Sequence, residues 1–148
     1  MDEALAAAER QCAARGALLT PLRRLVLRLV LEAGQPVGAY ALLERLKGER
    51  GAASAPPTIY RALDFLLEHG LIHKLERLNA FLPCVEAAHG HDHAHPHQFL
   101  ICRQCGRTAE VGDHAIARAL DDAARRLGFR LERATVEAEG LCAACQAN

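Results

Sequence analysis

Two C-x-x-C pairs, Cys102 with Cys105 and Cys142 with Cys145, are the residues of this chain best suited to chemistry. Four cysteine thiolates in two such pairs match the tetrahedral ligand set of a structural zinc ion. A zinc ion closed by four thiolates has no open position for a substrate, so these pairs predict a structural role and no catalysis. The alternative is a redox-active C-x-x-C pair, but two pairs that join strand ends favour a metal staple.

A second group of metal-binding residue types lies upstream of the first pair and around it. It contains His73, Cys84 and Glu110, and a segment from His89 to His97 in which every second residue is histidine. One thiolate, imidazoles and a carboxylate suit tetrahedral Zn²⁺. Taken singly, His73 also fits an ordinary histidine on a strand face, and Cys84 a small buried apolar residue. In an extended segment, one side would carry four histidines that form either a further, weaker metal site or a loosely chelating loop: His89, His91, His93 and His97.

The composition limits the kind of protein. The chain has 148 residues, of which 51% are apolar, and a formal net charge of zero. This length allows one ordinary domain or two small ones, and the zero charge means that any nucleic-acid-binding face must be local. No apolar signal segment and no run of about 20 apolar residues occurs. We therefore expect a cytoplasmic protein with no membrane contact, where paired cysteines indicate metal ligands rather than disulfides.

Three helices are predicted before the metal-binding residues begin. Ahead of these three helices, residues 1–18 have an Ala-rich composition typical of a helix. The first of the three begins at Thr20 and Pro21, an N-cap residue followed by proline at the first helical position. Gly34 ends this helix. One of its faces should be buried, because apolar residues recur at i, i+3, i+4, i+7 and i+8: Leu22, Leu25, Val26, Leu29 and Val30.

A second short helix carries apolar residues from Ala39 to Leu46, and a loop is predicted over residues 48–57. A third helix should begin near Thr58 and end at Gly70, followed by a hairpin of two short strands, 71–76 and 80–82. Three helices and then a hairpin is the order of a winged helix-turn-helix, in which the third helix enters the DNA major groove.

The rest of the chain predicts a β-β-α-β arrangement, with strands over 98–102 and 108–111, a helix over 113–127 and a strand over 129–139. This part is small for an independent fold, so zinc or a partner subunit must help to stabilise it. The predicted fold class is therefore α+β. It divides into a winged helix-turn-helix DNA-binding domain, a hinge with the His-rich loop, and a small dimerisation and zinc-binding domain: residues 1–83, 84–97 and 98–148.

With these residues in view, the chain resembles the Fur family of bacterial metal-responsive repressors. The resemblance runs from about residue 10 to residue 146. Two stretches, Pro56 to Leu67 and Gly140 to Cys145, are similar to the zinc-responsive branch of that family. Iron-responsive relatives typically have a histidine three residues before the first knuckle cysteine, where this chain has Phe99. Besides the two C-x-x-C pairs, the motifs are Leu19-Thr20-Pro21-x-Arg23, Thr58-Ile59-Tyr60-Arg61-Ala62-Leu63 and Gly70-Leu71-Ile72.

The resemblance implies which residues would hold the regulatory metal and what the protein binds. The implied regulatory zinc site is His73, Cys84, His95 and Glu110, with the choice between His95 and His97 left open. The implied protein is a homodimer that holds at least two Zn²⁺ per protomer. It binds double-stranded DNA at an inverted-repeat operator and represses zinc-uptake genes.

For DNA contact, the resemblance implies that Arg61 and Tyr40 touch purines, and arginine suits bidentate contact with guanine. Contacts to phosphates are expected from Thr58 and Tyr60, and from Arg23 or Arg24. Tyr60 also fits a position partly in the core, and the arginines also fit a merely solvated face.

There are three rival interpretations, two of them from other classes of protein. A sensor of another metal or of peroxide would share the family, but the thiol of Cys84 favours zinc because hard-metal sites prefer carboxylate and imidazole. A zinc hydrolase built on His73, His95 and Glu110 needs an open coordination position, and no H-E-x-x-H occurs. A metal-buffering protein would use the His-rich loop and leave the winged helix without a purpose. We therefore expect no enzyme and no small-molecule substrate.

Overall fold

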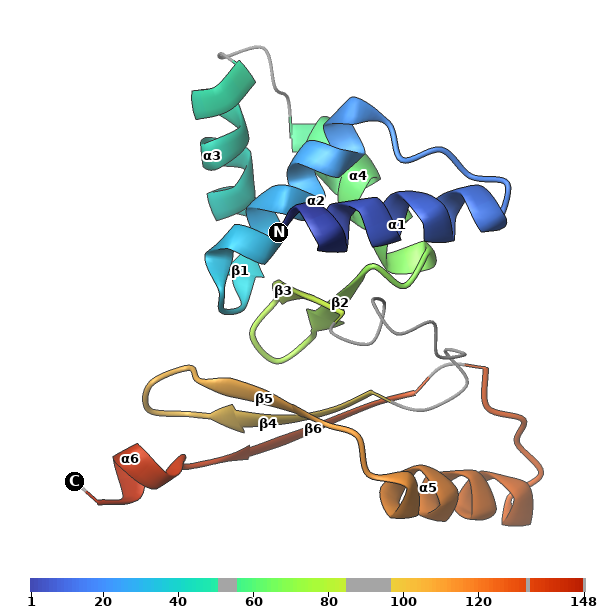
Figure 1. Ribbon diagram of the computed structural model, residues 1–148. Helices are drawn as coiled ribbons and strands as arrows, with labels where there is room; N and C mark the ends of the chain where they lie inside the picture. Colours follow the sequence, from blue (N-terminus) through green and yellow to red (C-terminus); the bar gives the residue numbers. More distant parts are fainter. Residues whose placement is uncertain (51–55, 85–96, 133, 148) are drawn as a thin grey trace. The chain divides into compact units, whose positions relative to one another are not determined.

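The computed structural model describes residues 1–50, 56–84, 97–132 and 134–147. The chain divides into two compact units, Met1–His91 and Asp92–Asn148, which we describe one at a time (Figure 1). None of the described helices is long and apolar enough to cross a membrane. The predicted three-part division stays a prediction, because residues 85–96, which hold most of the proposed hinge, lie outside the described residues.

The N-terminal unit contains four helices (Figure 1): α1 (Asp2–Ala14), α2 (Pro21–Ala33), α3 (Ala39–Arg50) and α4 (Pro56–Glu68). Helix α2 has the predicted ends, since the Thr20 hydroxyl accepts the Arg23 backbone N–H and Gly34 follows with a left-handed φ of 63°. The predicted loop over 48–57 was too long. Helix α3 continues through Gly48, and α4 begins two residues before Thr58 because proline is tolerated in a first helical turn.

The hairpin after α4 consists of β2 (Ile72–Leu75) and β3 (Ala80–Pro83), paired antiparallel. A third strand that the sequence did not predict, β1 (Val37–Gly38), pairs with β3, so the sheet order is β1-β3-β2. It spans only two residues, too few for any periodic pattern. Helices followed by this hairpin confirm the predicted winged helix-turn-helix.

All four helices contribute side chains to the core of the N-terminal unit. The amphipathic spacing predicted for α2 buries Val26, Leu29 and Val30 as expected, whereas Leu22 and Leu25 remain only partly buried. Helix α4 buries Ile59, Ala62, Leu63 and Leu66. This core fixes where the exposed face of α4 points.

The C-terminal unit has a three-stranded sheet of order β5-β4-β6, with helix α5 (His114–Arg126) as the connection to the last strand (Figure 1). The strands are β4 (His97–Cys102), β5 (Thr108–Val111) and β6 (Thr135–Gly140), and the short helix α6 (Ala143–Gln146) follows. The β4–β5 pair is antiparallel and the β4–β6 pair is parallel. This arrangement confirms an α+β fold.

The predicted last strand, 129–139, was wrong at its start. Strand β6 begins at Thr135, opposite His97, and its pairing with β4 ends where Gly140 faces Cys102. Because β4 has only six residues, it can pair with only six residues of β6. Pairing also extends β4 one residue before its predicted start at Gln98.

Candidate metal sites and nucleic-acid interface

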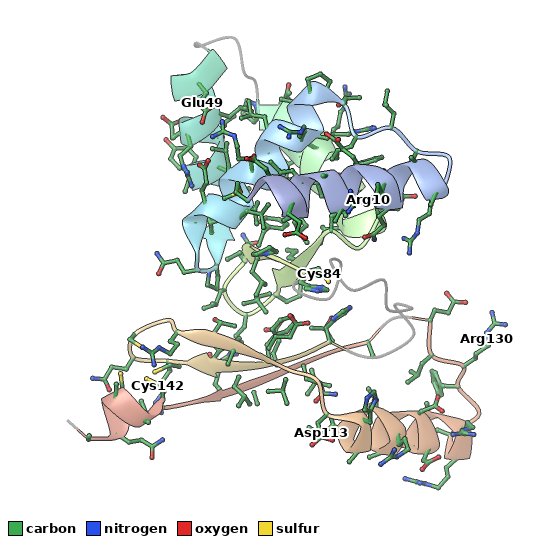
Figure 2. The ribbon with its side chains drawn as sticks, viewed as in Figure 1. Arg10, Glu49, Cys84, Asp113, Arg130 and Cys142 are labelled. Carbon is green, nitrogen blue, oxygen red and sulfur yellow. The ribbon has the colours of Figure 1, made fainter. Side chains whose placement is uncertain are left out.

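The four cysteines of the C-x-x-C pairs come together at one end of the C-terminal sheet. Cys102 ends β4, and Cys142 follows β6 as the residue before α6 (Figure 2). The two pairs meet because β4 and β6 run parallel in a register that places Cys102 beside Gly140. All four sulfur atoms lie within 4.8 Å of one another.

These distances fit a tetrahedral metal ion. Four sulfur ligands at roughly 2.3 Å from a zinc ion lie about 3.8 Å from one another, and the sulfur atoms of Cys105 and Cys142 are 3.7 Å apart. The donor set is all thiol, which suits zinc better than a hard cation. The four cysteines therefore fit a closed zinc site that staples the ends of two strands.

Backbone donors set the charge of this cluster before any metal binds. The Cys142 backbone N–H donates to the Cys102 sulfur at 3.4 Å, and this donor together with the Cys105 backbone N–H lowers the pKa of Cys102 to about 6. Hydrogen bonding to the Cys142 side chain, followed by burial, raises the pKa of Cys145 to about 12. A backbone hydrogen bond also lowers the pKa of Cys142, so these donors favour the thiolate form that metal binding requires.

Two residues of the proposed regulatory site lie in the N-terminal unit. His73 is on β2 and Cys84 directly follows β3 (Figure 2). The strand register pairs His73 with Leu82, which places His73 and Cys84 on the same face of the hairpin at diagonal positions. The backbone N–H of Cys84 donates to the Leu71 carbonyl at 3.1 Å, and both side chains are buried. The hairpin thus carries a buried imidazole and a buried thiol on one face.

A histidine and a carboxylate, two further predicted or alternative ligands, lie in contact in the C-terminal unit. His97 opens β4 and Glu110 lies on β5, and His97 Nδ1 is 3.2 Å from Glu110 Oε1. Their side chains are only 18% and 16% exposed. Four of the histidines predicted as ligands, His89, His91, His93 and His95, lie outside the described residues. The choice between His95 and His97 therefore stays a prediction.

Four of the residues predicted to contact DNA lie on α3 and α4: Tyr40, Thr58, Tyr60 and Arg61. Tyr40 at the start of α3 is 75% exposed and Tyr60 on α4 is 53% exposed, so the alternative that Tyr60 is partly in the core was wrong. Arg61 is exposed and Thr58 is half-buried. The start of α4 therefore presents a tyrosine and an arginine to solvent.

Three of these predicted residues share a pocket of about 280 Å³ between the starts of α2 and α4. Arg23, Thr58 and Arg61 line it, together with Thr20, Leu22 and Ala62. The alternative phosphate contact, Arg24, instead forms an ion pair with Glu9 of α1 at 2.8 Å. Sequence reasoning found three lining residues through the family motifs but missed the other three, which are brought together only by the packing of α2 on α4.

A winged helix with an arginine-lined pocket, in a chain that also carries clustered metal ligands, defines a metal-binding transcription regulator. The model of the ferric uptake regulator family matches residues 14–139. The zinc uptake regulation protein of Escherichia coli (strain K12) is 42% identical over 145 residues, covering 97% of this chain and 82% of that protein.

Two solved structures share this fold along nearly the whole chain. A zinc uptake regulator complexed with zinc and DNA has a TM-score of 0.90 and 40% identity, covering 99% of this chain and 95% of that one. The crystal structure of holo XcZur has a TM-score of 0.85 and 44% identity, covering 97% of each chain. The chain belongs to the ferric uptake regulator family, whose members are transcription regulators and not enzymes.

Proposed function

We propose that this protein is a zinc-responsive repressor that binds DNA as a homodimer and controls zinc-uptake genes in the cytoplasm. The observation that carries the proposal is the His73 and Cys84 pair, a buried imidazole and thiol on the hairpin of a winged-helix unit. A thiol in such a pair favours zinc over Fe²⁺ or Mn²⁺. The likeness to relatives named zinc uptake regulation proteins supports the same metal.

The cysteine cluster is the proposed structural zinc site, with ligands Cys102, Cys105, Cys142 and Cys145. The proposed regulatory site takes His73 and Cys84 from the N-terminal unit and Glu110 with His95, or with His97, from the C-terminal unit. At least two zinc ions per protomer follow from these two sets. A further, weaker site is proposed at His89, His91, His93 and His97.

Regulation would act through the relative arrangement of the two units, with the hinge in residues 84–97. Each unit supplies only part of the ligand set, so the full set binds zinc tightly only in arrangements that bring both parts together. Zinc binding then shifts the population towards those arrangements and, by linkage, raises DNA affinity. A coupling typical of allostery, roughly 1–3 kcal/mol, changes affinity about 5–150-fold.

A second copy of the chain is the proposed partner of the C-terminal unit. Large apolar side chains remain exposed there, including Leu127 at 75%, Phe129 at 68% and Leu100 at 55%. A two-fold dimer presents two winged helices, which predicts an inverted-repeat operator. In each protomer Arg61 and Tyr40 would contact purines, while Thr58, Tyr60 and Arg23 would contact phosphates.

The test is DNA binding by Cys84→Ser at controlled free zinc, with Cys12→Ser as the matched control. Both changes replace a buried thiol by a hydroxyl, but Cys12 lies on α1, outside the proposed metal sites. We expect Cys84→Ser to keep one zinc ion per protomer and a dimeric fold, and to lose the zinc-dependent rise in affinity. A normal zinc response in Cys84→Ser would contradict the site, and an equal response to Fe²⁺ and Mn²⁺ in the wild type would contradict zinc sensing.

A further inference from the structure

Three planar side chains stack on one another at the surface of the N-terminal unit. The guanidinium carbon of Arg23 lies 3.6 Å from the centre of the Phe65 ring. Phe65 also stacks on His69, the residue directly after α4, with ring centres 3.9 Å apart and planes inclined by 25°. Phe65 follows Arg61 by four residues, so both lie on the same side of α4.

Two further groups hold the ends of this stack. Arg23 Nη1 donates to the Leu18 carbonyl at 2.8 Å, which fixes the plane of the guanidinium. At the other end, the His69 carbonyl accepts Gln11 Nε2 at 2.8 Å, which ties the end of α4 to α1. A guanidinium held by an aromatic face and a carbonyl loses little freedom when it binds a ligand.

Arg23 differs from its neighbours on α2 in having no carboxylate partner among the described residues. Arg24 pairs with Glu9 at 2.8 Å, and Arg28 pairs with Glu32 and with Glu49 of α3. The Arg23 side chain instead lines the pocket between the starts of α2 and α4. No described carboxylate lines this pocket.

The rest of the pocket suits a small oxyanion. Arg61 adds a second guanidinium, and the hydroxyls of Thr20 and Thr58 add two neutral partners. The positive end of the α2 dipole points to the same place. Two guanidinium side chains and two hydroxyls line a pocket of about 280 Å³, a donor set that can bind the oxygens of one phosphodiester group.

We infer that Phe65 is a positioning residue, which holds the Arg23 guanidinium beside this pocket ready for one phosphate of the DNA backbone. The inference rests on the proposed DNA-binding function. It assigns Arg23, and not Arg24, to the phosphate. It also adds Phe65, whose effect would pass through Arg23, to the residues that determine DNA affinity.

The experiment is a double-mutant cycle on a duplex selected from a random library by the zinc-loaded wild-type protein. We expect Arg23→Ala to weaken binding roughly tenfold and to reduce the slope of log K against log salt by about 0.9. Phe65→Leu should weaken binding about two- to fivefold, and Phe65→Tyr, which keeps the aromatic face, should not. Arg24→Ala is the matched control and should leave the salt slope unchanged.

The effect of Phe65→Leu in the Arg23→Ala background separates a positioning role of Phe65 from a merely structural one. In the Arg23→Ala background, Phe65→Leu should cause no further loss of affinity, because its effect passes through Arg23. An equal loss in both backgrounds would overturn the role of Phe65, and an unchanged salt slope in Arg23→Ala would overturn the phosphate site. If the wild-type protein selects no duplex, the proposed function itself fails.

Duplexes that each carry one neutral methylphosphonate linkage would locate the phosphate. The wild type should lose affinity at one linkage in each half-site where Arg23→Ala loses none. If no linkage distinguishes the wild type from Arg23→Ala in this way, the assignment of Arg23 to a phosphate is overturned, even where the salt slope has changed.

Discussion

Replacing Cys142 by serine should unfold the C-terminal unit and leave the N-terminal unit folded. Cys142 contributes a sulfur atom 3.7 Å from that of Cys105 and a backbone N–H to Cys102. Phe99 and Ile101 are the only large apolar side chains of the described C-terminal unit that are almost fully buried. Their burial contributes about 3–6 kcal/mol together, whereas a structural zinc ion contributes about 10–16 kcal/mol in small domains.

The comparison decides the expected outcome. A unit that loses most of the larger contribution cannot offset the conformational entropy of its remaining residues. The N-terminal unit has its own core, built from all four of its helices, and does not depend on this metal. We therefore expect one zinc ion fewer per protomer and a dimer that dissociates, with α2 and α4 still protected.

The assay combines zinc content with hydrogen exchange measured on peptides. Peptides covering β4 and β6 should exchange rapidly in Cys142→Ser and slowly in the wild type. Cys12→Ser replaces a buried thiol of α1 and is the control. It should have the same zinc content as the wild type, and its β4 and β6 peptides should exchange as slowly. A Cys142→Ser protein with full zinc content and with β4 and β6 still protected from exchange would refute the claim that zinc bound by these cysteines holds the C-terminal unit folded.

Two further changes test local features of the fold. Asp113→Ala removes the carboxylate that accepts the Ala115 N–H at 2.7 Å at the start of α5 (Figure 2), so thermal unfolding of the zinc-loaded protein should show a loss of about 0.5–2 kcal/mol. Leu66→Ala removes a side chain with 0% exposure from α4, and urea unfolding should show a loss of about 2–5 kcal/mol in the N-terminal unit.

The sequence predicts the helices of the N-terminal unit well because their signals are local. Thr20, Pro21 and Gly34 mark the two ends of α2 through capping and backbone geometry, which depend on a few neighbouring residues. The cysteine cluster was also predictable, because C-x-x-C spacing is itself a local pattern. These features required no knowledge of how distant segments pair.

The features that the sequence did not predict depend on pairing between distant segments. Strand β6 starts where its partner β4 starts, and β1 exists only because β3 offers it an edge. The contact between Arg23 and Phe65 joins two helices across 42 positions of sequence, and no periodic pattern encodes it. The sequence proposed Glu110 together with His95 or His97, and the distance between His97 and Glu110 follows from the register of β4 on β5.

The distribution of metal ligands between the two units explains why one proposed site can be structural and the other regulatory. The four cysteines of the C-x-x-C pairs all belong to the C-terminal unit, so their sulfur atoms meet without any movement between units. A zinc ion bound there would stabilise the C-terminal unit alone and would not depend on how the two units are arranged. His73 and Cys84 belong to the N-terminal unit and Glu110 to the C-terminal unit. Any ion that used all three would make zinc affinity depend on how the units are arranged, and linkage then requires that arrangement to depend on zinc.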